Sequence, residues 1–584
     1  MPSPKRPRPA ALALFGLVLA ALTPGPSWGE VRGGGPTPAA GAAGAGDASN
    51  LRVAPTGVPL ARSTASRARD SVSVKDYGAI ADGASHPVSE WVSSGRYASL
   101  AAIQADYPHV TALGDEIDWA AVQAAADAPV VGGLNTTLRL ASGKLILNRD
   151  VRLTPGQREV RGEGSGATEV RFTGGSKGFA FEGAGPADRI QFQGLAVSTA
   201  QAGLGTAFTV RFAGTQAATQ QALFREITVL ASGGFFKHAT HLTNVRSPAY
   251  AGVFVTGSLA SPGMEAAHVF RGTTTDIRFS GSFVLSARVG FDIGELCEGL
   301  MLNDSIAIAV DIGVKANFLK GKPWIQVNGG QIAAYRFGID AHNAKQIHVI
   351  GTTMYAATYE PGRMATYVGI NLTGADTRNV FVRGNYFQAD GYRVPPAPAA
   401  TARTVMAVEA GAYGLVADNQ FSGFDRGVVL AAGTTDWRVI GNMNLSVTTP
   451  FADSGTANVY QDATAGGRIV LGAGGYVEDL SGATSAQIKL HDRGAGPNLK
   501  GAATLLDDGA IYHRLLNDDD AVKREYLSAN AARVRLGGNG DATAALSTDY
   551  EGNTYLIVGG VEKRVSIGAP DSAGKGFRTL RIPN

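Results

Sequence analysis

The chain has 584 residues, of which 77 are glycine, and charged residues make up only 17% of it. Low charge with abundant glycine argues against long charged helices and favours short strands joined by tight turns. The formal net charge is +3, and no basic run follows the extreme N-terminus, so a nucleic-acid partner is not expected. Cys297 is the only cysteine, which excludes an intrachain disulfide.

Residues 1–29 are typical of a signal peptide. Lys5, Arg6 and Arg8 precede an apolar run at residues 10–22, and small residues then allow cleavage. The run is short for a membrane span, which takes about 20 residues. We therefore expect a secreted or periplasmic protein with no membrane span after processing, and a retained anchor is the alternative. Residues 30–70 are rich in Ala, Gly and Pro and predict a disordered linker.

An N-terminal cap is predicted over residues 71–137. The stretch SVSVKDYGAIADG (71–83) reads as a strand and a glycine turn, which can cover the exposed backbone of a first solenoid coil. The stretch DWAAVQAAA predicts a capping helix with Asp118 at its N-cap and Trp119, Val122 and Ala126 on one face. The residues between these two elements predict an inserted lobe.

Two short apolar segments alternate between residues 277 and 444, in a fixed order with variable spacing. Successive copies of the segment that begins with a small residue start 19 to 38 residues apart. Variable spacing is typical of a parallel β-solenoid, in which the corner loops differ in length while the strands keep theirs. A β-sandwich is the alternative. Asn385, Asn419 and Asn442 recur at one corner, where stacked amides can satisfy turn backbone. We expect residues 138–465 to form coils about 4.8 Å apart.

The order VKDYGAIADG, IDWAAVQAAAD and LRLASGKLIL (138–147) resembles the N-terminal signature of the pectate-lyase-like superfamily. That group includes rhamnogalacturonase- and epimerase-like enzymes and phage tailspikes. The resemblance implies an all-β fold, a right-handed parallel β-helix with a short N-terminal capping helix. This chain departs from the family by the insertion at residues 84–117. Its predicted solenoid also lacks the tandem Asp pair and Gly-His-Gly element of polygalacturonase-like enzymes and the basic pattern of calcium pectate lyases, so no catalytic role carries over; adjacent Asp residues occur only in the tail, at 507–508 and 518–520, without the paired element.

Residues 466–584 predict a C-terminal antiparallel β domain for binding or trimerisation, because hairpin-like strands there alternate with turn residues. The ending GKGFRTLRIPN (574–584) resembles the closing residues of some phage tail fibres and tailspikes. This second resemblance implies a homotrimer.

The variable position of the first repeated segment predicts a column of outward side chains, because side chains alternate along a strand. With neighbours about 4.8 Å apart, Asp311 and Asp340 fit the carboxyl spacing of about 5–5.5 Å in retaining glycosidases. Asp292 and Asp340, about 9.6 Å apart, border on the inverting spacing. Solvated side chains that diverge from a curved face are the alternative. The predicted column is Asp292, Asp311, Asp340, Asn371, Glu409 and Val429.

Two long corner loops, at residues 356–366 and 389–403, would flank this column. Aromatic rings stack on sugars and arginines pair with uronate carboxylates, although insertions without a function are the alternative. The residues predicted to be catalytic are Asp311, Asp340, His342 and Glu360. Those predicted to bind substrate are Asp292, Tyr355, Tyr359, Arg363, Asp390, Tyr392 and Arg393.

Outside this column, histidines give little support for a metal site. His238 and His241 are three residues apart, which predicts opposite faces of a strand and no shared metal. Glu265 and His268 have no partner that the sequence identifies.

Together these patterns predict an exported protein that cleaves an acidic polysaccharide by glycoside hydrolysis on the side face of the solenoid. Asp340 or Asp311 would be the acid and the other the nucleophile or base. A polysaccharide lyase or epimerase acting on uronates is one alternative, with Arg363 or calcium neutralising the carboxylate and Tyr355, Tyr359 or His342 moving the proton. A non-catalytic tailspike-like or adhesin-like fibre is the other. No cofactor is expected, except calcium in the lyase case.

Overall fold

The computed structural model describes residues 71–128, 136–214, 221–259, 263–357, 366–389 and 403–462, with short strands before and after them. The chain divides into two units, Met1–Ala65 and Ser66–Asn584. In the first unit, β1 (Arg52–Val53) pairs antiparallel with β2 (Arg62–Ser63). All other elements described below belong to the second unit.

The first strand of the N-terminal cap is β3 (Ser71–Ser73). It pairs in parallel with β4 (Thr136–Arg139) and so covers the edge of β4, as the sequence predicts. A 3-10 turn, η3 (Val74–Tyr77), follows and ends at Gly78, whose φ of +92° favours glycine. The predicted inserted segment contains two short helices, α3 (Ser89–Ser93) and α4 (Leu100–Asp106).

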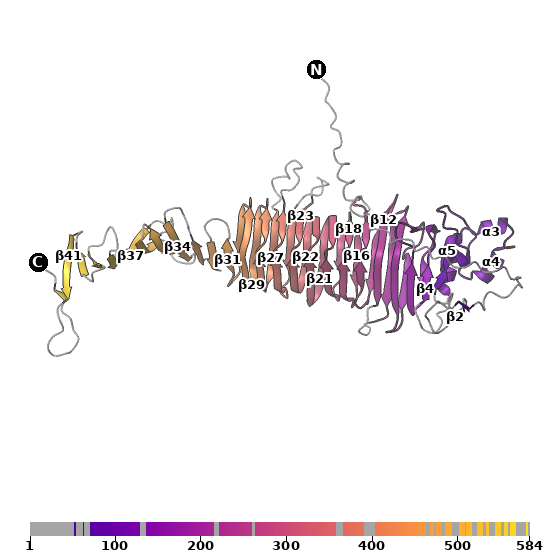
Figure 1. The fold of residues 1–584 in the computed structure, drawn as a ribbon, viewed down its shortest axis with the longest axis horizontal. Helices are drawn as coiled ribbons and strands as arrows, with labels where there is room; N and C mark the ends of the chain where they lie inside the picture. The colour runs from indigo at the N-terminus through magenta and orange to yellow at the C-terminus, as the bar shows by residue number, and fades with distance from the viewer. Residues whose placement is uncertain are drawn as a thin grey trace, which may run out of the picture. The chain divides into compact units, whose positions relative to one another are not determined.

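The capping helix is α5 (Ile117–Asp127), and it lies against the first coils at the β4 end of the stack (Figure 1). Its N-cap is Glu116, so the predicted N-cap role of Asp118 is wrong, because the helix begins before that residue. The buried Asp118 carboxylate instead accepts hydrogen bonds from the backbone N–H groups of Ile80 (2.7 Å) and Ile146 (3.0 Å). Asp118 therefore ties the glycine turn and the first coil to the helix.

The predicted parallel β-helix is confirmed. The parallel pairings form three ladders that begin with β4–β7, β5–β8 and β6–β9, and we call these ladders the first, second and third sheets. The coils stack side by side from β4 to β31 (Figure 1). This is the architecture that the resemblance to the pectate-lyase-like superfamily implied. Several long strands bend through corners and serve more than one sheet: β10 (Arg189–Thr199), β12 (Ala222–Ala231), β21 (Ile306–Asn328), β22 (Gln331–Ile350), β27 (Thr404–Ala417) and β29 (Arg426–Leu445).

The remaining strands each serve one sheet. The first sheet adds β4, β7 (Gln157–Arg161), β14 (Ala249–Ala251), β17 (Thr275–Ser280), β20 (Glu298–Asn303), β25 (Arg378–Arg383) and β31 (Val459–Asp462). The second adds β5 (Gly143–Leu147), β8 (Thr168–Phe172), β15 (Phe254–Thr256), β18 (Phe283–Leu285), β23 (Thr353–Ala356), β26 (Tyr386–Gln388) and β28 (Gln420–Ser422). The third adds β6 (Val151–Leu153), β9 (Phe179–Gly183), β11 (Ala202–Phe212), β13 (Phe235–Thr243), β16 (Ala266–Arg271), β19 (Val289–Ile293), β24 (Val368–Thr373) and β30 (Thr449–Asp453).

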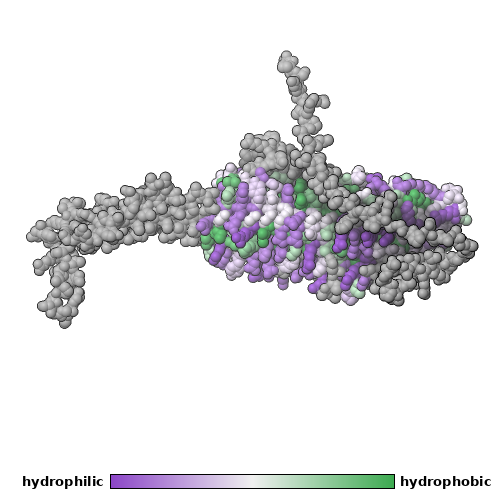
Figure 2. Space-filling view, viewed as in Figure 1, coloured by the Kyte–Doolittle hydropathy of each residue, from purple (hydrophilic) through white to green (hydrophobic). Residues whose placement is uncertain are grey.

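Aromatic rings stack inside the coils at about the spacing of the coils themselves. Phe224 lies parallel to Tyr250 with ring centroids 4.7 Å apart, and Tyr250 lies parallel to Phe279 at 4.1 Å. All three side chains are buried. The face visible in Figure 2 mixes hydrophilic side chains with scattered apolar ones, and exposed apolar residues of the coils include Phe381 and Ile350.

The predicted asparagine stack at one corner is confirmed. Nδ2 of Asn385 donates to Oδ1 of Asn419 (2.9 Å), and Nδ2 of Asn419 donates to Oδ1 of Asn442 (2.9 Å). Each amide also donates to a carbonyl of the adjoining strand, such as Val382 O at 2.9 Å for Asn419. The buried amides thus satisfy both one another and the turn backbone, as buried polar groups require.

The predicted antiparallel C-terminal domain is confirmed at the level of strand pairing. β31 pairs antiparallel with β32, and each described strand after it pairs antiparallel with the next. No described helix is long and apolar enough to cross a membrane. The strands are β32 (Arg468–Leu471), β33 (Gly475–Asp479), β34 (Ser485–Asp492), β35 (Gly501–Asp507), β36 (Ala510–Leu516), β37 (Val522–Ala529), β38 (Arg533–Leu536), β39 (Ala544–Asp549), β40 (Thr554–Val558), β41 (Val561–Ile567) and β42 (Leu580–Arg581).

Candidate functional site

On the outer face of the third sheet, four consecutive coils each carry a polar side chain at the same position. Asp292 pairs with Lys315, Lys315 with Asp340, and Asp340 with Asn371. We call these four residues the charged column. Lys315 separates the two carboxylates, so like charges do not occupy adjacent coils, where they would destabilise the sheet.

The predicted alignment of the column is right for Asp292, Asp340, Asn371 and Val429 and wrong for Asp311 and Glu409. Ala407, and not Glu409, occupies the column. Lys315, and not Asp311, stands between Asp292 and Asp340. The predicted retaining-type spacing between Asp311 and Asp340 is therefore not formed.

The reason for the error at Asp311 is a corner inside β21. Asp311 precedes Ile312, where the third-sheet register of this strand begins, and its backbone N–H donates to Ala287 O (3.3 Å). The true member follows a glycine by two residues, as in Gly290–Asp292, Gly313–Lys315 and Gly338–Asp340. This glycine spacing is the signal in the sequence that identifies Lys315.

Polar contacts fix the carboxylates of the charged column. Nη2 of Arg271 donates to Oδ2 of Asp292 at 2.5 Å, and Nη1 donates to the Asp292 carbonyl at 3.2 Å. Nδ2 of Asn371 donates to Oδ1 of Asp340 at 2.8 Å. His342, on the strand of Asp340, places Nδ1 2.9 Å from Oγ1 of Thr373 in the next coil. Each predicted acidic group on this wall is thus held in a defined orientation.

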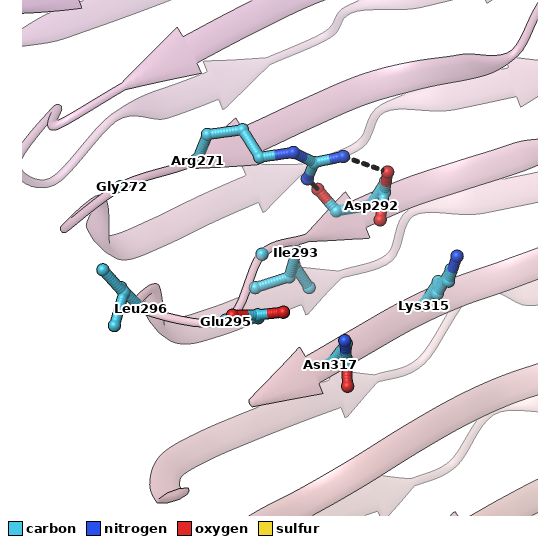
Figure 3. Close-up of a pocket in the computed structure, with 9 residues that line it drawn as sticks. Arg271, Gly272, Asp292, Ile293, Glu295, Leu296, Lys315 and Asn317 are labelled. Atoms are coloured by element: carbon cyan, nitrogen blue, oxygen red, sulfur yellow. Dashed lines mark hydrogen bonds and ion pairs between the residues drawn. The ribbon is translucent and has the colours of Figure 1, made fainter. Parts of the chain in front are cut away.

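A groove of about 390 Å³ opens beside the charged column (Figure 3). Arg271 and Asp292 are joined on one side of it, and Lys315 and Asn317 project from the next coil. Both signs of charge and an amide therefore converge on one concave surface. The lining residues are Arg271, Gly272, Asp292, Ile293, Gly294, Glu295, Leu296, Lys315 and Asn317.

A second polar group lies on the same wall, two coils before Asp292. The rings of His238 and His241 lie 5.8 Å apart, and Nε2 of His238 is 3.6 Å from Oε2 of Glu265. We call these three residues the histidine cluster. Burial and the neighbouring His241 lower the pKa of His238 to about 4, and burial with nearby Arg271 lowers the pKa of His241.

The predicted placement of these two histidines on opposite faces is wrong. Ala239 and Thr240 are consecutive and both buried, so β13 breaks its alternation and brings His238 and His241 to the same side. Glu265 has a partner after all, while His268 is fully buried with Nδ1 3.0 Å from Thr240 Oγ1. Burial lowers the pKa of His268 to about 3, which suits a neutral core side chain.

The other predicted site residues do not join this wall where they are described. Tyr355 lies on β23 in the second sheet, paired with Ala333 and Gln388, and its ring centroid is 6.4 Å from that of Tyr386. Six predicted residues lie outside the described part of the chain: Tyr359, Glu360, Arg363, Asp390, Tyr392 and Arg393.

Among the described residues, no group of three or more His, Cys, Asp or Glu is arranged to hold a metal ion. The calcium expected for a lyase therefore has no described set of ligands of this kind, and it stays a prediction.

No family model matches the chain, and no curated protein sequence matches it. Solved structures do. The mannuronan C-5 epimerase AlgE6 A-module of Azotobacter vinelandii is 15% identical, with a TM-score of 0.41 over 67% of this chain and 97% of that one. DFA-IIIase from Arthrobacter chlorophenolicus A6 is 13% identical, with a TM-score of 0.40 over 64% and 94%. The tailspike protein gp49 of Pseudomonas phage LKA1 is 14% identical, with a TM-score of 0.32 over 77% and 97%. These TM-scores, all below 0.5, are too low to transfer a property to this chain.

Proposed function

We propose that this protein is an exported β-helix protein that binds and processes an acidic polysaccharide on the outer wall of its third sheet. The observation that carries the proposal is the charged column beside the groove of Arg271 and Lys315. A polymer that lies along the stack meets a new donor or acceptor at each coil, about every 4.8 Å. Export by the segment at residues 1–29 is part of the proposal.

The chemistry of the wall suits a glycan with carboxylates. Arg271 keeps donors beyond those that hold Asp292, since a guanidinium has five N–H groups, and Lys315 is exposed. Both cations can pair with uronate carboxylates. Asp340 and Asn371 offer an acceptor and a donor for sugar hydroxyls. The mixture of charges favours a substrate that carries both carboxylates and hydroxyls over a purely anionic one.

Hydrolysis, the predicted reaction, depends on a carboxyl pair. With Asp311 outside the column, the remaining pair is Asp292 and Asp340, two coils and about 9.6 Å apart. That separation exceeds the retaining spacing and only borders on the inverting range of about 6.5–9.5 Å. Lys315 also stands between the two groups. We therefore propose glycan binding and turnover without the retaining-type pair.

A binding panel tests the proposal. The purified full-length protein is titrated with polygalacturonate, polymannuronate and a neutral glucan, and Lys315→Gln is compared with wild type. We expect binding of a polyuronate that weakens by at least about tenfold in Lys315→Gln, because a charge-assisted hydrogen bond contributes about 1.5–3 kcal/mol. Arg438→Gln, which removes an exposed cation from the first sheet, is the matched control and should bind normally. Equal affinity for neutral and acidic glycans, or no binding at all, would contradict the proposal.

We also propose that residues 466–584 assemble three copies of the chain. The described strands there pair only with their sequence neighbours, in an antiparallel series. A sheet has to bury one face against another layer to be stable, and a second and third copy can supply that layer. A non-catalytic glycan-binding fibre is the alternative function, and this assembly would serve it equally well.

A further inference from the structure

The histidine cluster contains two imidazoles and a carboxylate, the groups that commonly transfer protons in enzymes. Its members are not part of the charged column. His241 and Asp292 belong to the same column of the third sheet, with Val269 between them. Thr243, two residues after His241, pairs with Arg271. His241 and Arg271 are therefore diagonal neighbours on one face, about 7–8 Å apart at the backbone.

The charges that affect the pKa of His241 agree with this placement. Arg271 and Asp292 both act on the protonation of His241, the arginine disfavouring the imidazolium and the aspartate favouring it. Burial is the larger effect, and it lowers the pKa of His241. A lowered pKa favours the neutral ring that a general base requires, while the negative charge of Asp292, two coils away, favours the cation that forms on proton uptake.

We propose that His241 is the general base of a β-elimination on a uronate sugar whose carboxylate pairs with Arg271. This inference rests on the proposed function, since it needs an acidic glycan on this wall. The role falls to His241 rather than His238 because His241 shares its column with Asp292 and lies diagonal to Arg271. His238 pairs instead with Thr206 and Ala266, outside that column, and its Nε2 faces Glu265.

The β-elimination needs no co-reactant, because the proton and electron pairs are all accounted for within the substrate and His241. The unprotonated ring nitrogen of His241 takes the proton from the sugar carbon next to the carboxylate, and Arg271 stabilises the negative charge that develops on that carboxylate. The electron pair of the broken C–H bond forms a C=C bond to the adjacent carbon. The C–O bond of the glycosidic link at that carbon breaks, and the leaving oxygen receives the proton from the His241 imidazolium. The products are a chain with a new hydroxyl and a chain that ends in an unsaturated uronate.

The experiment follows product formation and binding separately. Wild type, His241→Gln and His348→Gln are incubated with the polyuronate that binds best, and ultraviolet absorbance and reducing ends are both measured. His348 is the matched control, because it lies on the first sheet and pairs with Gln326 and Phe381. We expect absorbing product from wild type and from His348→Gln. In His241→Gln we expect a loss of at least about 10²-fold, as for removal of a general base, with glycan affinity within about twofold of wild type.

A pH profile separates catalysis from a structural role. Arg271 disfavours the imidazolium of His241, so Arg271→Gln should shift the acidic limb of kcat/KM to higher pH and weaken glycan binding. A histidine with only a structural role would not produce that shift.

The outcomes distinguish a failure of the proposed function from a failure of the elimination step. Absence of glycan binding would overturn the proposed function together with this inference. Binding with new reducing ends but no absorbance, or binding with no turnover, would overturn the elimination and leave the binding wall intact. Full activity in His241→Gln would remove His241 as the base even if elimination occurs.

Discussion

Glycines stack on one another next to the charged column, and they leave no room for a side chain. A Cβ on Gly313 would lie 2.5 Å from Gly338 O, and a Cβ on Gly338 would lie 2.4 Å from Gly369 O. Both distances are well inside van der Waals contact. The glycines therefore let neighbouring coils approach closely at the position that sets the register of the column.

Gly338→Ala should destabilise the coil. The added methyl overlaps backbone that cannot rotate away, and such overpacking costs about 1–3 kcal/mol. Thermal and denaturant unfolding measure the change. Gly166→Ala is the matched control, because a Cβ there meets no atom within 4 Å and should change stability little. Equal stability of the two variants would show that the coils can separate at Gly338 without cost.

At the scale of elements, a structural feature can be predicted from the sequence when the same residue type recurs at a fixed position in each coil. The corner amides of Asn385, Asn419 and Asn442 are predictable because the same residue recurs at the same offset after an apolar segment. Lys315 was missed because two apolar signatures overlap inside β21, and the feature that selects the right one is the glycine two residues before the column position, which Asp311 lacks.

The histidine cluster was missed for a different physical reason. Strict alternation places His238 and His241 on opposite faces, and only the break in alternation at Ala239 and Thr240, both buried, brings them together. The contact of Arg271 with Asp292 likewise joins residues of neighbouring coils, so it follows from register and not from any local pattern. Fold class is thus predictable from repetition, whereas the site depends on bends that repetition does not show.

In the N-terminal cap, His86 lies between the carboxylates of Asp82 and Glu90, and we call these three residues the clip. Nε2 of His86 is 3.0 Å from Asp82 Oδ2, and Nδ1 is 2.9 Å from Glu90 Oε2. The Glu90 and Asp82 carboxylates raise the pKa of His86 above its ordinary value of 6.5. A backbone hydrogen bond from Ala84 and the contact with His86 lower the pKa of Asp82.

The clip should loosen as pH rises. A raised folded-state pKa contributes stability that is complete below about 6.5, the unfolded value, and is lost as pH rises through the folded value. Hydrogen exchange of residues 84–117 should therefore be faster at alkaline than at mildly acidic pH, and His86→Gln should remove most of this difference. The sign reverses at low pH for Asp82, whose contribution is lost as pH falls through its lowered pKa. A wild-type exchange rate independent of pH across this range, after correction for intrinsic exchange, would contradict the clip.

At the scale of the whole molecule, assembly can be tested by mass. We expect full-length protein to sediment as a trimer and a variant that ends at residue 465 to sediment as a monomer, because the proposed contacts between copies lie in the antiparallel strands. Glycan turnover by that monomer would show that the wall of the third sheet works without assembly. A shortened variant that neither turns over glycan nor attaches to cells, beside a full-length protein that attaches without turnover, would favour the fibre.

Because the coils stack, the number of residues between two members of the wall does not determine the distance between them. Members of the charged column are 23, 25 and 31 residues apart in sequence, from Asp292 to Lys315, Asp340 and Asn371, yet each lies one coil from the next. Corner length can thus vary while the pitch of the wall stays constant. The side chains of the wall and the lengths of the corners can then change independently, so an insertion at a corner leaves the spacing of the charged column unchanged.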